Sequence, residues 1–147
     1  MNIVILAAGK GSRMKSTLTK VLHHIGGKAM IYRVVETALI LNPKKIFIVV
    51  SENKNEIQHE LKPLSQNSRI VYIDQKDTLG TGHAVMIAAP LLDSSCDTLV
   101  LYGDVPLVSS DSLKILCKKS ESPTLKVLTA IVEEQTGYGR IIRNSNN

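Results

Sequence analysis

Aromatic residues are scarce in this chain of 147 residues: Phe, Trp and Tyr together make up 3% of it, and Trp is absent. The core must therefore be built from Ile, Leu, Val and Ala. Proteins that bind single-stranded nucleic acid usually stack bases on aromatic side chains, so the shortage also argues against that function. The formal net charge of +5 still suits an anionic partner. Because the basic residues are scattered, we expect small phosphate compounds and no nucleic acid.

Cysteine is scarce as well. Cys96 and Cys117 have neither the spacing of a metal site nor a C-x-x-C motif, which is typical of free thiols in a reducing compartment. No apolar run approaches the ~18 residues that a membrane span needs. Ile3–Ala8 is too short for the apolar part of a signal peptide, and no basic segment precedes it. We therefore expect a cytoplasmic protein with no membrane partner.

Short apolar runs alternate with helical patterns along the chain. Such alternation predicts an α/β fold, a mostly parallel sheet with helices on both faces and ligands at the carboxyl ends of the strands. The length suits one domain. We expect strands at 3–7, 46–50, 69–73, 97–102 and 125–132, with one more beginning at 140–142. We expect helices at 30–39, 53–61 and 83–89, and a fourth that begins after Ser109 or Ser110 and reaches Lys118 and Lys119.

Three of these strands end in loops of small or polar residues. Ala7–Arg13 is rich in glycine and leads to cations, among them Lys20, so its backbone N–H groups and these charges suit phosphate. Gln75–Gly82 offers an amide and backbone groups that can read the edge of a base. Tyr102–Pro106 contains Asp104, a carboxylate suited to Mg²⁺. Because parallel strands end at one edge of a sheet, we expect a single site there.

Two common phosphate-binding motifs do not fit the first loop. The pattern G-x-G-x-x-G needs a glycine where Met14 stands, which disfavours a dinucleotide-binding enzyme. The P-loop needs Gly-Lys-Ser where the chain has Met14-Lys15-Ser16, and the methionine spoils the tight backbone cradle. An ordinary ATPase is therefore disfavoured too.

The remaining pattern is L-A-A-G-x-G-[ST]-R-M, with Lys20 seven residues after Arg13. It resembles the sugar-phosphate nucleotidyltransferases, and more closely the N-acetylglucosamine-1-phosphate uridyltransferase domain of the bifunctional enzymes that make UDP-N-acetylglucosamine. The matching segments, in order, are Leu6–Met14, Lys20–His23, Gln75, Leu79–Ala84, Leu101–Leu107 and Gly137–Ile141. The chain departs from the family at Thr19, where a proline is usual; this removes a rigid φ but no chemical group.

The resemblance implies a role for each matching residue. The nucleotide would be surrounded by Leu6, Ala7, Ala8, Gly9 and Gly11. Arg13 and Lys20 would contact phosphates and carry the catalysis, and Asp104 would bind Mg²⁺. The uracil would be recognised by Gln75, Gly80 and Thr81. The binding site of the sugar nucleotide would be lined by Tyr102, Gly103, Asp104 and Gly139.

Simpler interpretations of these residues stay open. Arg13 and Lys20 could be solvated surface cations, and Asp104 could cap the turn before Pro106. Gln75 could be an ordinary loop amide. We expect His83 to be structural, at the start of its helix, rather than catalytic.

The resemblance also implies the three-layer, Rossmann-like nucleotide-diphospho-sugar transferase fold and a reaction. A phosphate oxygen of N-acetylglucosamine-1-phosphate attacks the α-phosphorus of UTP, and pyrophosphate leaves. The product, UDP-N-acetylglucosamine, serves peptidoglycan and lipopolysaccharide synthesis and hence cell shape. Since the nucleophile is already anionic, positioning and electrostatics should dominate catalysis.

The family's transferase domain continues well past position 147, and the missing part includes an Asn that is a second metal ligand. We expect this chain to lack the family's left-handed β-helix acetyltransferase domain, which forms the trimer. We therefore expect residues 1–147 to be the N-terminal part of a transferase domain, incomplete at its C-terminal end. Three hypotheses remain. The first is an active uridyltransferase, and the second is a truncated, catalytically impaired remnant that binds nucleotide or UDP-sugar. The third is a small basic protein that binds nucleic acid.

Overall fold

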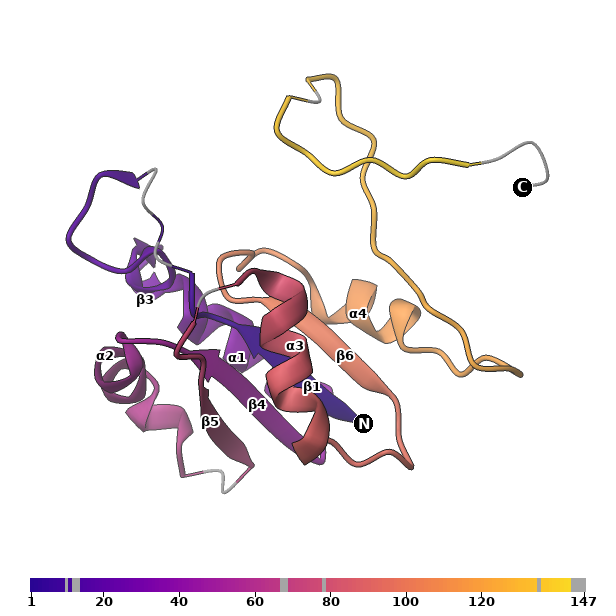
Figure 1. Cartoon of the computed structure of the whole chain (residues 1–147), viewed down its shortest axis with the longest axis horizontal. Coiled ribbons are helices and arrows are strands. Elements are labelled where there is room, and N and C mark those ends of the chain that lie inside the picture. Colours follow the sequence, from indigo (N-terminus) through magenta and orange to yellow (C-terminus); the bar gives the residue numbers. More distant parts are fainter. Residues whose placement is uncertain (10, 12–13, 67–68, 78, 135, 144–147) are drawn as a thin grey trace.

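A parallel sheet forms the centre of the molecule (Figure 1). The computed structural model describes residues 1–9, 11, 14–66, 69–77, 79–134 and 136–143. Within these residues the sheet has four strands in the order β5-β4-β1-β6, and each neighbouring pair is parallel. The strands are β1 (Asn2–Leu6), β4 (Lys45–Val50), β5 (Ile70–Asp74) and β6 (Thr98–Tyr102). The predicted α/β class and the first four predicted strands are confirmed.

The helices cover both faces of this sheet. They are α1 (Met30–Ile40), α2 (Lys54–Glu60), α3 (Thr81–Ala88) and α4 (Ser110–Leu116). Alternate residues of a strand point to opposite faces, so Ile3 and Ile5 pack with side chains of α1, α2 and α4, whereas Val4 packs with Ala84 and Ala88 of α3. The result is the three-layer arrangement that the sequence predicts.

The strand order creates a switch point between β1 and β6. The chain first adds β4 and β5 on one side of β1, and then crosses to place β6 on the other side. In open α/β sheets, ligands commonly bind beyond the carboxyl ends of the strands at such a point. Leu6 and Tyr102 are paired at this end of β1 and β6, so the loops that follow them leave the sheet there.

The fourth helix begins where the sequence predicts but ends earlier. Ser109 caps it, because its side-chain oxygen accepts a hydrogen bond of 3.1 Å from the backbone N–H of Ser112. The helix stops at Leu116, so the prediction that it reaches Lys118 and Lys119 is wrong. Lys114 is the basic residue of the last turn instead.

The predicted strands at 125–132 and 140–142 are wrong for the part of the chain that the structure describes. No strand or helix follows α4 there, and the segment runs away from the sheet (Figure 1). Leu125 is 89% exposed and Ile131 is fully exposed. A strand is stabilised by hydrogen bonds to a neighbouring strand and by burial of one face, and this apolar segment has neither.

The sequence analysis missed a small hairpin. Strands β2 (His24–Ile25) and β3 (Lys28–Ala29) pair antiparallel around Gly26 and Gly27, whose φ angles are 56° and 80°. Positive φ at both central residues is the conformation of the type I′ turn, which is common in two-residue hairpins. Arg33 holds the turn, because its guanidinium donates hydrogen bonds of 2.7 Å to the carbonyl oxygens of Ile25 and Gly26.

Short 3-10 helices complete the fold: η2 (Lys20–Leu22), η3 (Lys62–Leu64) and η4 (Ala89–Leu91). Of the helices in the described residues, none is long and apolar enough to cross a membrane.

Candidate active site at the carboxyl edge of the sheet

The three predicted loops leave the same edge of the sheet and are joined there by backbone hydrogen bonds. The N–H of Ala7 donates to the carbonyl oxygen of Val49 over 2.9 Å, and the N–H of Gly103 donates to that of Leu6 over 2.9 Å. The N–H of Gln75 donates to the carbonyl oxygen of Val50 over 2.7 Å. The ends of the four strands therefore hold the loops in fixed relative positions.

Lys20 and Asp104 meet at this edge. The ammonium Nζ of Lys20 lies 2.6 Å from Oδ2 of Asp104 and donates a hydrogen bond to it. Both side chains keep contact with solvent, at 40% and 30% exposure. Lys20 begins η2, which is anchored by the buried Val21 and Leu22. Two residues that the sequence assigns to one site thus lie in contact.

Gly103 brings the two loops close together. A Cβ at this position would lie 3.0 Å from the carbonyl oxygen of Leu6, 3.1 Å from Ile31 Cδ1 and 3.2 Å from Val21 Cγ1. These distances are shorter than ordinary contacts, so a larger residue would push β6 away from β1 and η2. The predicted binding residue Gly103 therefore has a structural role as well.

The two described glycines of the first loop differ. Gly11 has a φ of 61°, and a Cβ there would lie 2.8 Å from Cβ of Lys20, so this position needs glycine to fold. Gly9 is exposed and has open space around it. The protein itself would therefore tolerate a side chain at Gly9. Arg13, the other predicted catalytic cation, lies outside the described residues.

Two residues that the sequence analysis did not single out hold the start of this loop. Nδ2 of Asn53 donates to the carbonyl oxygen of Ala7 over 3.1 Å, and the hydroxyl of Ser51 donates to that of Ala8 over 3.2 Å. Ala7 and Ala8 are themselves buried. The available signal was the pair of small polar residues directly after β4, at the same edge of the sheet.

Gln75 is the most deeply placed polar side chain of the site, at 3% exposure. Its Nε2 lies 3.0 Å from Nδ1 of His83 and 3.5 Å from the carbonyl oxygen of Gly80. Gly80 precedes α3 with a φ of 98°, and Thr81 is the first residue of that helix. The residues predicted to recognise a base are therefore assembled, and His83 joins them by contacting Gln75.

Two of the predicted binding residues have fewer links to the rest of the site. Tyr102 ends β6 next to Leu6 and is about half exposed. Gly139 lies in the exposed segment after α4, which Figure 1 shows leaving the sheet, so it is not brought together with the other predicted residues.

The donor chemistry at Asp104 fits Mg²⁺ only as part of a larger ligand set. Carboxylate oxygen is a suitable ligand, and this one already faces a cation, the ammonium of Lys20. Among the described residues, no group of three or more His, Cys, Asp or Glu side chains is placed to hold a metal ion. A Mg²⁺ bound at Asp104 would therefore need further ligands from outside these side chains, such as phosphate oxygens and water.

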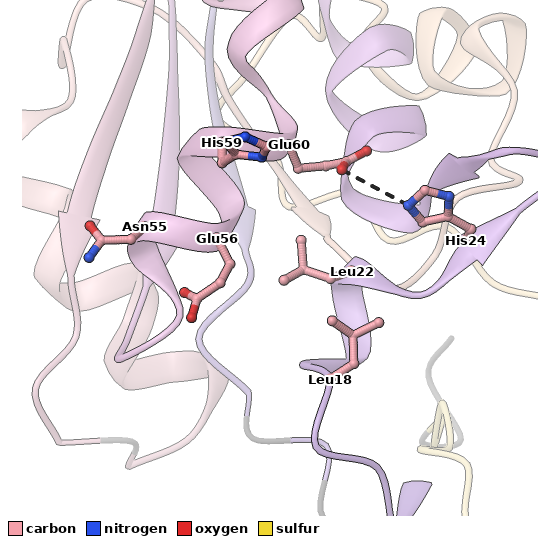
Figure 2. Close-up of a pocket in the computed structure, with 7 residues that line it drawn as sticks. All are labelled: Leu18, Leu22, His24, Asn55, Glu56, His59 and Glu60. Atoms are coloured by element: carbon pink, nitrogen blue, oxygen red, sulfur yellow. Dashed lines mark ion pairs between the residues drawn. The ribbon is translucent and has the colours of Figure 1, made fainter.

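An open pocket of about 470 Å³ lies between η2 and α2 (Figure 2). The residues that line it are Leu18, Leu22, His24, Asn55, Glu56, His59 and Glu60. Glu60 reaches toward His24, with 4.0 Å between the charged atoms. None of the described residues that the sequence assigns to the nucleotide lines this pocket.

Comparison with known proteins decides the family. Residues 3–143 match the MobA-like NTP transferase domain. The chain belongs to this family. Its curated relatives include the bifunctional protein GlmU of Neisseria meningitidis serogroup B, which is 47% identical over 146 residues. GlmU of Cupriavidus metallidurans is 48% identical over 145 residues. In both comparisons the alignment covers 99% of this chain and 31% of the relative, so the chain spans about a third of their length.

Solved structures support the same fold. A putative glucose-1-phosphate thymidylyltransferase from Bacillus anthracis superimposes with a TM-score of 0.68 at 21% identity, over 78% of this chain and 48% of that one. HddC from Yersinia pseudotuberculosis, in complex with GMP-PN, superimposes with a TM-score of 0.59 at 28% identity, over 71% and 50%. This MobA-like NTP transferase chain therefore has the fold of nucleotidyltransferases.

Proposed function

We propose that this MobA-like NTP transferase joins UTP and N-acetylglucosamine-1-phosphate, giving UDP-N-acetylglucosamine and pyrophosphate for cell-wall precursor synthesis. The observation that carries the proposal is the contact between Lys20 and Asp104 beside the glycine loop, at the edge where Gln75 also lies. The 47% identity to GlmU over 99% of the chain supports the choice of this reaction within the family.

In this proposal the chain's own residues act by position and charge. The backbone of Ala7–Gly9 and Gly11 lies along the nucleotide, and Gln75 with the start of α3 holds the base. Lys20 and Arg13 offset the negative charge of the two phosphates that must approach each other. When bound at Asp104, Mg²⁺ would add positive charge near the α-phosphate that is attacked. No proton has to be removed, because the attacking phosphate oxygen is already ionised.

The proposal also covers the partners and location. UTP and the sugar phosphate are its predicted substrates, with no role for nucleic acid or a membrane. Residues 1–147 act as the N-terminal part of a transferase domain. A cytoplasmic location remains a prediction from the sequence.

A second candidate function is nucleotide or UDP-sugar binding without turnover. The sugar side of the site favours it, because Tyr102 is half exposed and Gly139 lies in the segment that leaves the sheet. In the described part of the chain, β6 is also an edge strand. Lys20 contacts Asp104, and Gln75 lies by Gly80, whereas no such contact joins the two residues proposed for the sugar.

Measuring pyrophosphate release from UTP, Mg²⁺ and N-acetylglucosamine-1-phosphate separates the two candidates. Turnover that requires both substrates and stops with a chelator supports the transferase. Calorimetric binding of UTP without any turnover supports the binding function instead. Absence of both turnover and binding contradicts both.

A further inference from the structure

Strand β6 has a free edge. Within the described residues it pairs only with β1, so its other side has no neighbouring strand. An open edge is a template for pairing with another strand, and proteins usually protect it with charged residues, proline or a covering segment. The five residues of β6 include no charged residue and no proline. Its edge is therefore open to a further strand.

One face of β6 is uncovered as well. Val100 is paired with Val4 of β1, and residues paired across two strands point to the same face of the sheet. Val4 is buried and packs with Ala84 and Ala88 of α3, whereas Val100 is 37% exposed. Helix α3 thus covers β1 and leaves the β6 side of this face partly bare.

The same chain carries an apolar segment that the sheet does not bury, Leu125–Val132. All of its residues are exposed, although six of the eight are Leu, Val, Ile or Ala. These apolar residues occupy both odd and even positions, which is typical of a strand that is buried on both faces. So large an exposed apolar segment is unfavourable in water and favours an interaction that covers it.

The segment can reach another molecule. Residues 117–124 join it to α4, and eight extended residues span up to about 28 Å. Figure 1 shows this part of the chain leaving its own sheet, and no strand follows α4 in the described residues. The single chain therefore leaves both the β6 edge and the apolar segment uncovered.

We propose that two copies of this chain associate by exchanging the segment, each adding its Leu125–Val132 to the free edge of β6 in the other. Each copy offers the same edge and the same segment, so the exchange closes on itself as a two-fold dimer. This association goes beyond the proposed function and does not depend on it.

The area of such a contact suits a dimer. Burying a Leu, Ile or Val side chain removes roughly 100 Å² of surface from water. Five such side chains in each segment, in two exchanged segments, bury on the order of 1,000 Å² on the segments' own side. The covered surfaces of β6 add to this area, and stable interfaces bury about 1,200–2,000 Å² in total. A reciprocal exchange therefore reaches the size that a stable dimer needs.

Sedimentation of the whole chain over a range of concentrations tests the association. We expect a monomer–dimer equilibrium for the wild type. Val100→Lys places a charge on the uncovered face of β6, and Ile131→Lys places one in the exchanged segment. Because burial of an unpaired charge is costly, each variant should weaken dimerisation roughly tenfold or more. The control Ile40→Lys changes an exposed isoleucine at the end of α1 and should leave dimerisation unchanged.

A mixture of the two variants distinguishes exchange from other contacts. The Val100→Lys chain keeps an intact segment and the Ile131→Lys chain keeps an intact β6, so one of the two exchange contacts can form between them. We expect mixed dimers at concentrations where each variant alone is monomeric, and native mass spectrometry detects them when one chain is isotope-labelled. A mixture that stays monomeric while the wild type dimerises overturns the exchange.

Two further results overturn the proposal. One is a wild-type chain that stays monomeric at all concentrations; protected amides in its Leu125–Val132 would show that the segment pairs with its own β6. The other is a dimer that both lysine variants leave unchanged, since another surface would then hold it together. Circular dichroism checks that each variant is folded. If Val100→Lys is unfolded, Thr98→Lys replaces it, at an exposed position on the same face of β6.

Discussion

The ammonium of Lys20 lies 2.6 Å from the carboxylate of Asp104, across 84 positions of sequence. In the proposed function Lys20 binds phosphate and Asp104 binds Mg²⁺. In the free protein the two charges neutralise each other. Binding of a magnesium nucleotide would replace this single contact by two, ammonium to phosphate and carboxylate to metal. Substitutions of these two residues therefore test the proposed site.

Lys20→Ala is expected to weaken UTP binding roughly tenfold or more, because it removes a charged hydrogen-bond donor to phosphate. Its effect on folding should be small, since exposed ion pairs contribute about 0–1 kcal/mol. Titration calorimetry and urea unfolding measure the two effects. The matched control is Lys28→Ala, whose ammonium lies 2.7 Å from Glu36 outside the site. Equal UTP affinity in both variants would contradict the role of Lys20.

Asp104→Asn is expected to reduce the effect of Mg²⁺ on UTP binding. In the wild-type chain, Mg²⁺ should strengthen binding and a chelator should reverse the gain. The variant keeps the shape of the side chain but loses the charge that a hard cation prefers. Calorimetry with and without Mg²⁺ makes the comparison. If the variant gains as much from Mg²⁺ as the wild type, Asp104 is not the metal ligand.

Alanine at Gly9 and at Gly103 should affect different properties. Gly103→Ala crowds Leu6, Ile31 and Val21, so we expect a loss of about 1–3 kcal/mol in unfolding free energy. Gly9→Ala meets open space, and its stability should change by less than about 0.5 kcal/mol. Its UTP affinity should nevertheless fall, because the new methyl group occupies the path of the ligand to the backbone. A Gly9→Ala chain that binds UTP normally would show that the loop does not lie along the nucleotide.

Asp93 is expected to make folding stability depend on pH in the acid range. Hydrogen bonds from Lys44 and Ser95 hold the pKa of its carboxyl far below the ordinary 3.8. The unfolded chain therefore takes up the proton first as pH falls, so this contribution is present above about 3.8 and is lost below it. Asp93→Asn should have a lower unfolding midpoint than the wild type at neutral pH, and the difference should shrink on acidification. A difference that stays constant with pH would contradict this prediction.

The sequence was sufficient for the parts of the site that follow from strand order. Buried apolar runs predicted β1, β4, β5 and β6, and parallel strands that share an edge bring Lys20 and Asp104 to one place. Local sequence patterns were insufficient where a structure depends on contact with another segment of the chain. Residues 125–132 are apolar enough for a strand, but a strand also needs a neighbour to pair with. The contact between Gln75 and His83 likewise depends on how α3 sits against the end of β5, which periodicity does not report.

The central claim is that UTP binds at the carboxyl edge of the sheet. It is tested most directly by finding which backbone amides respond to UTP. Amide NMR shifts of the chain are followed while UTP and Mg²⁺ are added. The account predicts that the largest changes occur at Ala7–Gly9, Gly80–His83 and Gly103–Asp104. Changes centred on the pocket around Leu18 and His59, or no change at saturating UTP, would contradict it.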